Sequence, residues 1–315
     1  MDNIKLLQVP FDFGQDSFGV RQAYSYLINR GLIQRLSQFA PTVEVGNLYF
    51  PAKSLRGISG NMKAKGECSR FNHMISDEIS SLHLRSSFLL NIGGDHGLGL
   101  GTVHGLLSHD PETIVVWADA HGDINTPYTS KSANFHGMPL SFLLGLARDR
   151  EFNWIRKLLP SRNLIYFGPR ELDKAEKNII DELGIQYFSS EMINEEGADV
   201  LLTQALSNID PLGIKPIHLS FDVDVFDSYD MRSTGIRVKS GPRLDEVFIM
   251  AETLAQTLRL RSMDVVEFNP LIGTKQEVEV SSDIIIELIE VIMDKIFPDI
   301  QTTRFNDEKL NQSFY

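Results

Sequence analysis

The 315-residue sequence predicts an α/β fold with three layers (α, β, α), in which a mostly parallel sheet of about eight strands lies between helices. Apolar, β-type runs alternate with helical periodicities along the whole chain. Since a parallel crossover needs a covering element, this alternation predicts helices on both faces of the sheet. No Pro/Ser-rich linker, repeat or low-complexity segment interrupts it, so we expect a single domain over residues 1–315. The polar, aperiodic stretch 302–315 is expected to be a loose tail or a strip used in subunit contacts.

The strands are expected where short apolar runs end at turn-forming residues. Ile4 to Val9 precedes a Gly-rich turn from Gly14 to Gly19, and Phe88 to Ile92 precedes the pair Gly93-Gly94. The eight expected strands cover residues 4–9, 42–45, 88–92, 114–117, 163–167, 186–188, 217–221 and 264–268. Helical spacing of apolar residues predicts helices over residues 26–32, 61–84, 97–107, 137–147, 179–183, 197–207, 243–258 and 281–296.

Composition and charge exclude several classes of function. The chain has 42 acidic and 30 basic residues and a net charge of -12, which makes nucleic acid and anionic membranes poor partners. Cys68 is the only cysteine, so an internal disulfide is excluded and a reducing compartment is favoured. No apolar run approaches a membrane span, and the first residues lack the pattern of a signal peptide. We therefore expect a cytoplasmic protein.

Charged residues follow the strand expected at 114–117. Asp119, His121 and Asp123 are spaced by two, and alternate side chains of an extended backbone share a face. Two carboxylates and an imidazole on one face can hold a metal ion. Taken alone, the same spacing fits a solvated loop equally well.

Two further strand ends carry the same kinds of side chain. Asp222 and Asp224 follow the strand at 217–221 with the same spacing of two, and His96 follows the strand at 88–92. Because an open parallel sheet gathers ligands beyond the carboxyl ends of its strands, we expect these groups to converge. Carboxylate and imidazole ligands without thiolate favour Mn, with Zn, Fe or Co as lesser options. The glycines at 97, 99 and 101 fit neither a dinucleotide fingerprint nor a phosphate loop, which excludes nucleotide binding there.

Five motifs in one order resemble the signature set of the ureohydrolase family and are most similar to its arginase branch. They are GGDHG at 93–97, DAHGDINTP at 119–127, SANFHGMPLSFLLG at 132–145, SFDVDVFD at 220–227 and DVVEFNP at 264–270. The resemblance implies an arginase-like fold, a trimer or hexamer and two Mn²⁺ ions per subunit. It also implies that L-arginine, a small guanidino substrate, is cleaved to L-ornithine and urea by attack of a metal-bridging hydroxide.

The resemblance also assigns ligands to the two ions. One ion would be held by His96, Asp119, Asp123 and Asp222. The other would be held by Asp119, His121, Asp222 and Asp224, so that Asp119 and Asp222 bridge the pair. Six side chains, two of them shared, are enough for a dinuclear site.

The remaining assignments concern catalysis and substrate binding. Glu267 would pair with the planar guanidinium and His136 would carry a proton, with Asp123 counted as catalytic besides its role as a ligand. Without the resemblance, the sequence favours Glu267 as a turn carboxylate and His136 as a helix-start residue. The substrate carboxylate would contact Asn125, Ser130 and Ser132, and its ammonium would contact Asp173. Because agmatine has no carboxylate to bind, this set favours L-arginine.

Four departures from the family pattern bear on turnover and on substrate choice. Ser228 stands where proline is usual, Gly97 where serine is commoner, and Gly122 where a side chain is usual. Gly241-Pro242-Arg243 stands where Gly-Leu-Thr is expected, with the threonine near the guanidinium. The alternatives are therefore agmatinase, guanidinobutyrase or formiminoglutamase activity, or a catalytically weak binding protein of the same fold. A two-metal phosphatase is disfavoured because the expected rim has no cluster of Arg or Lys.

Overall fold

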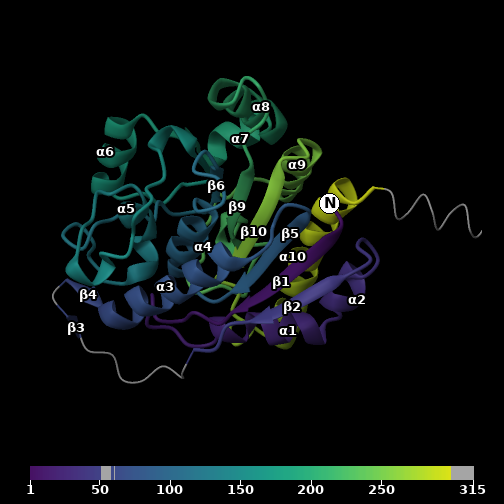
Figure 1. Ribbon diagram of the computed structural model, residues 1–315, viewed down its shortest axis with the longest axis horizontal. Helices are drawn as coiled ribbons and strands as arrows, with labels where there is room; N and C mark the ends of the chain where they lie inside the picture. Colours follow the sequence, from purple (N-terminus) through teal and green to yellow (C-terminus); the bar gives the residue numbers. More distant parts are fainter. Residues whose placement is uncertain (51–57, 60, 299–315) are drawn as a thin grey trace, which may run out of the picture.

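The computed structural model describes residues 1–50, 58–59 and 61–298, and its centre is an eight-stranded sheet (Figure 1). The strand order is β2-β1-β5-β10-β9-β6-β7-β8, and every neighbouring pair is parallel. The sheet strands are β1 (Asn3–Val9), β2 (Val43–Asn47), β5 (Ser87–Gly93), β6 (Ile114–Ala118), β7 (Leu164–Phe167), β8 (Gln186–Phe188), β9 (Ile217–Asp222) and β10 (Leu260–Val266). A separate antiparallel pair joins β3 (Ile58–Ser59) and β4 (Met62–Lys63). The predicted three-layer fold class is confirmed.

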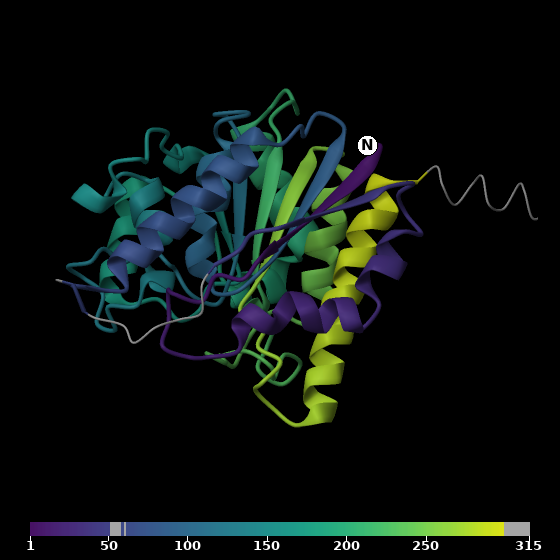
Figure 2. The same ribbon diagram turned by 60° about the horizontal axis from the view of Figure 1, so that its bottom comes forward.

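Two hydrophobic cores lie on the two faces of the sheet, because side chains of each buried strand alternate between them. One core packs against α1 (Ala23–Asn29), α2 (Leu32–Leu36), α7 (Ser190–Glu196), α8 (Ala198–Ile209), α9 (Leu244–Gln256) and α10 (Lys275–Ile296). The other packs against α3 (Lys65–Ser81), α4 (Gly99–Leu106), α5 (Pro139–Leu143) and α6 (Lys174–Leu183). Figure 2 shows the sheet between α3 and α10.

Several predicted helix boundaries were wrong, and local chemistry explains them. In place of one helix over 137–147, the structure has a 3-10 turn, Phe135–Gly137, and the short helix α5. α5 ends two residues before Gly145, which takes a left-handed φ of 75°. α10 begins at Lys275, six residues before the expected start, because Thr274 and Glu277 form a capping box there. The helix predicted over 61–84 spans only α3, since 62–63 belong to β4.

The single-domain organisation stays a prediction, and residues 302–315 lie outside the described part of the chain. Within the described residues, none of the helices is both long and apolar enough to span a bilayer. The central strands β5, β10, β9 and β6 are neighbours, and their carboxyl ends meet at one edge of the sheet. Residues at and just beyond the carboxyl ends of these four strands build the site.

Candidate metal centre and substrate pocket

His96 lies just beyond β5 and faces three carboxylates. Its Nδ1 is 2.9 Å from Oδ2 of Asp119, 3.1 Å from Oδ2 of Asp123 and 3.4 Å from Oδ2 of Asp222. All four side chains are buried. One imidazole nitrogen thus meets three carboxylates that come from two other strand ends.

The imidazole ring of His96 is held in one orientation. Trp117 stacks on this ring, with 3.9 Å between ring centroids and an interplanar angle of 8°. Nε2 of His96 lies 2.9 Å from Oγ of Ser220. A proton on Nε2 can be donated to Ser220, which leaves the Nδ1 lone pair for a ligand. The turn before His96 needs glycine, because a Cβ on Gly94 would lie 1.5 Å from the carbonyl oxygen of Phe11.

A second group of ligands shares Asp119. Nδ1 of His121 is 3.2 Å from Oδ1 of Asp119 and 3.1 Å from Oδ2 of Asp224. Asp224 is fixed by two hydrogen bonds: its backbone N–H donates to Asp222 and its Oδ1 accepts from the N–H of Ala120. His96, Asp119 and Asp123 form one group that could hold a metal ion, and Asp119, His121 and Asp224 form another.

The electrostatics of these groups favour a bound cation. Burial, together with the neighbouring carboxylates, raises the pKa of Asp222 well above its usual range and raises that of Asp123 to about 7. Burial would lower the pKa of His96, but hydrogen bonds with three aspartates raise it well above its ordinary value. Burial would also lower the pKa of His121, but the carboxylates of Asp224 and Asp119 raise it well above its ordinary value. Oxygen and imidazole donors without thiolate fit Mn or a similar divalent ion, so the residues present suit such a cofactor.

Glu267 follows β10 and is held from three sides. Its Oε1 accepts from the backbone N–H of His96 and lies 3.0 Å from Nδ1 of His136, and its Oε2 accepts from Nε2 of Gln15 at 2.5 Å. Its φ of 64° is unusual for a residue with a side chain, a strain typical of functional sites. Burial would lower the pKa of His136, but the contact with Glu267 raises it to about 9. Sequence reasoning missed Gln15, which lies in the Gly-rich turn after the first strand.

The four residues predicted to bind the amino-acid end of the substrate lie only partly in the pocket described below. Nδ2 of Asn125 donates to Asp173 at 3.2 Å, and its Oδ1 accepts from Thr129. Oγ of Ser130 and Oγ of Ser132 are 3.5 Å apart, and Ser132 is exposed while Ser130 is half-buried. Of these four predicted residues, Asn125 lines the pocket and the other three lie outside its lining.

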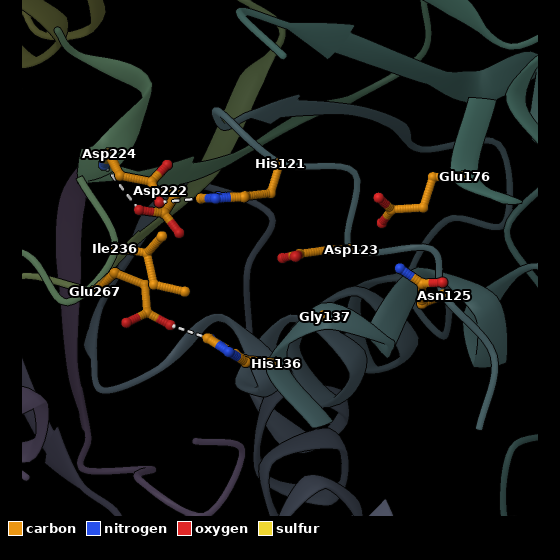
Figure 3. A pocket seen from close by; sticks show the side chains of 10 residues that line it. All are labelled: His121, Asp123, Asn125, His136, Gly137, Glu176, Asp222, Asp224, Ile236 and Glu267. Atoms are coloured by element: carbon orange, nitrogen blue, oxygen red, sulfur yellow. Dashed lines mark hydrogen bonds and ion pairs between the residues drawn. The ribbon is translucent and has the colours of Figure 1, made fainter. Parts of the chain in front are cut away.

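One pocket joins the candidate metal-binding groups to Glu267 and Asn125 (Figure 3). Its volume is about 160 Å³. It is lined by His121, Asp123, Asn125, His136, Gly137, Glu176, Asp222, Asp224, Ile236 and Glu267. Glu176 was missed, although its spacing of three from Asp173 is that of the capping box they form. Burial raises the pKa of Glu176 to about 7.

The segment 241–243, which departs from the family's Gly-Leu-Thr, does not line the pocket. The guanidinium of Arg243 turns away from the pocket and bonds to the carbonyl of Asn194 and to the carboxylates of Asp245 and Glu246. From the same stretch of chain, Ile236 lines the pocket. No signal in the sequence marked Ile236.

The other departures lie close to packed groups. A Cβ on Gly97 would be 2.8 Å from both Asp95 and Phe135, and one on Gly122 would be 2.9 Å from Glu176. Ser228 donates its backbone N–H to the carbonyl of Val238. Three of the departures therefore leave the metal ligands in place.

Arg170 supports the loop behind the ligands and was also missed. Its guanidinium donates to the carbonyls of Gly168, Asp224, Val225, Phe226, Val238 and Lys239. Asp224 belongs to the second ligand group, and Val238 lies two residues after Ile236. One side chain thus ties a ligand and a pocket wall to the end of β7. Its only signal in the sequence is the Gly-Pro-Arg turn after a strand.

Known proteins resemble this chain along most of its length. A family profile described as Arginase family matches residues 2–290. An arginase of Glaciozyma antarctica is 34% identical over 285 residues, which cover 87% of this chain and 83% of the relative. The crystal structure of Entamoeba histolytica arginase in complex with L-ornithine is 29% identical, with a TM-score of 0.85 and coverage of 93% of this chain and 98% of that one. The arginase of Bacillus caldovelox is 27% identical, with the same TM-score and coverage.

Proposed function

This chain belongs to the arginase family of ureohydrolases, and from that premise we propose that it hydrolyses L-arginine to L-ornithine and urea with two Mn²⁺ ions bound. The observation that carries the proposal is the pair of ligand groups that share Asp119 beside a pocket containing Glu267 and His136. A single ion would need only one such group. Shared carboxylates are typical of two-metal hydrolases.

The ligands divide between the two ions as follows. His96, Asp119, Asp123 and Asp222 would hold one ion. Asp119, His121, Asp222 and Asp224 would hold the other. When bound, such ions supply Lewis-acid chemistry that lowers the pKa of water. Ser220 and Trp117 keep the ring of His96 turned toward the ligands.

The reacting end of the substrate is assigned to Glu267 and His136. A guanidinium carbon is a poor electrophile because its charge is spread over three nitrogens, so the group must be fixed in place. Glu267 can accept two parallel hydrogen bonds from the planar cation. His136 lies 3.0 Å from Glu267 in the same pocket and can give a proton to the departing amine nitrogen.

The other end of the pocket supports an amino-acid substrate. Asn125 and Glu176 line it, and Asp173 lies behind them as the partner of Asn125. Asn125, with Ser130 and Ser132 at the rim, can donate to a carboxylate, and the acids can accept from an ammonium. Agmatine has the ammonium but no carboxylate, so it would leave the donors unused.

A substrate panel with added Mn²⁺ tests the proposal. We expect urea from L-arginine at a higher kcat/KM than from agmatine or guanidinobutyrate, and little formamide from formiminoglutamate. Asp119→Asn should abolish both metal binding and hydrolysis, while the matched surface variant Asp77→Asn, whose carboxylate is 73% exposed, should change neither. Activity on one of the other substrates alone would move the protein to a sister enzyme. A protein that takes up no metal would instead be a binding protein of this fold.

The expected trimer or hexamer, like the cytoplasmic location, stays a prediction. Light scattering of the purified chain would measure the subunit number. Nothing in the catalytic proposal depends on it, because every group assigned above comes from one chain.

A further inference from the structure

One stretch of the pocket wall is apolar. Ile236 is the single aliphatic side chain among the ten lining residues, and it is 47% exposed. Figure 3 shows it at the end of the pocket occupied by Asp222 and Glu267, with Asn125 and Glu176 at the opposite end. Ile236 therefore lies where the proposed substrate would carry its guanidinium.

The segment that carries Ile236 is fixed on both sides. Thr234 forms an isolated antiparallel bridge with Phe268, the residue after Glu267. On the other side, Arg170 donates to the carbonyl of Val238. The backbone that carries Ile236 is therefore held in place at this wall of the pocket.

An aliphatic wall changes what the guanidinium can satisfy. The cation presents five N–H donors, and Glu267 can accept from only two of them in a parallel pair. A guanidinium N–H turned toward Ile236 would lose its bound water and find no acceptor. This loss weakens the binding of the unmethylated substrate by about 5- to 100-fold. A methyl group on that nitrogen would replace the unmet donor with apolar contact.

We infer that Ile236 admits guanidino substrates alkylated on a terminal nitrogen, such as Nω-methyl-L-arginine, beside L-arginine itself. The inference rests on the proposed function and extends its substrate class. In the reaction, water adds its oxygen to the guanidinium carbon, the bond from this carbon to the chain nitrogen breaks, and that nitrogen takes a proton. L-Arginine gives L-ornithine and urea, and the methylated substrate gives L-ornithine and N-methylurea.

The test compares three forms of the full-length chain loaded with Mn²⁺: wild type, Ile236→Thr and Ile236→Val. Threonine and valine have nearly the same shape, so their comparison isolates the effect of one hydroxyl. Ornithine release is measured with both substrates, because both yield it. We expect Ile236→Thr to raise the kcat/KM ratio of L-arginine to Nω-methyl-L-arginine by about 5- to 100-fold. Ile236→Val should leave the ratio within about threefold of wild type, since it removes one methylene.

The outcomes separate this inference from the proposed function. A wild-type protein that releases ornithine from neither substrate contradicts the proposed function. A wild type that cleaves L-arginine, with Ile236→Thr and Ile236→Val giving the same ratio, overturns the inference alone. Should the threonine variant fail to fold, wild type decides the question: we expect its kcat/KM for the methylated substrate to reach at least about a tenth of that for L-arginine, and a lower value refutes the inference.

Discussion

Replacing Arg170 by methionine should both destabilise the fold and weaken metal binding. Its guanidinium donates to six backbone carbonyls, among them those of Asp224, Val225 and Phe226. Methionine has similar length but no donor, so these carbonyls would lose their partner. The segment that carries the ligand Asp224 would then be free to shift.

The magnitude follows from the three carbonyls whose residues are buried, those at 224–226. A hydrogen bond from a charged donor contributes about 1.5–3 kcal/mol, and partial rehydration of the half-buried site brings the total loss to about 3–5 kcal/mol. With an unfolding entropy of about 2.1 cal/mol/K per residue, each kcal/mol lowers the unfolding midpoint of this 315-residue chain by about 1.5 °C, so we expect a fall of roughly 5–8 °C. Because Arg170 orients a ligand from behind, the affinity for Mn²⁺ should fall by about 10- to 100-fold.

Thermal unfolding of the metal-free chain and a Mn²⁺ titration measure the two effects separately. Arg162→Met is the matched control, since Arg162 is 67% exposed and pairs only with the partly exposed Glu112 among the described residues. That control should cost less than about 1 kcal/mol and leave Mn²⁺ affinity unchanged. Arg170→Lys should fall in between, because one ammonium with three donors cannot reach six carbonyls. If Arg170→Met matched the control in both measurements, the assigned role of Arg170 would be wrong.

Three further outcomes follow from other contacts. Gln15→Leu removes the donor to Oε2 of Glu267 and should raise KM for L-arginine about 5- to 20-fold with unchanged Mn²⁺ content, checked by steady-state kinetics and elemental analysis. Burial lowers the pKa of His104 to about 4, so the unfolded chain binds more protons as the pH falls from about 6.5 toward 4, and stability declines there. Urea unfolding of His104→Gln should show a smaller decline over that pH range. Removing Mn²⁺ with a chelator at pH 7 should cost about 2.7 kcal/mol for each ion, or about 5.4 kcal/mol for two independent sites, relative to protein held at a Mn²⁺ concentration of 100 times Kd. An unchanged urea midpoint would contradict metal binding by the folded state.

The convergence of the candidate metal ligands could be predicted because it follows from their spacing along the sequence. Asp119, His121 and Asp123 follow β6 with a spacing of two. Asp222, the last residue of β9, and Asp224 repeat this spacing. In a parallel sheet all carboxyl ends lie at one edge, so residues far apart in the chain must meet there. Knowing which residues end each parallel strand was therefore enough to predict that these side chains lie close together.

The rest of the pocket depends on contacts between loops, which no local pattern encodes. Gln15 reaches Glu267 across 252 positions of the chain, and Arg170 reaches carbonyls of residues 224–239. Ile236 lines the pocket from a loop that is bridged to the chain beyond β10 through Thr234 and Phe268. Helix boundaries failed for a related reason: caps and left-handed residues decide them, while apolar periodicity reports only the buried face.

The distribution of charge in the pocket argues for a substrate with two cationic ends. Two divalent ions would neutralise the four aspartates of the ligand groups, which leaves Glu267 and Glu176 as the remaining acids of the lining. These two lie at opposite ends of the pocket in Figure 3. A guanidinium at Glu267 and an ammonium near Glu176 would satisfy both, whereas guanidinobutyrate would place a carboxylate beside Glu176 at an electrostatic cost. Agmatine also has two cations, so the choice between it and L-arginine depends on the donors of Asn125 and its neighbours at the rim.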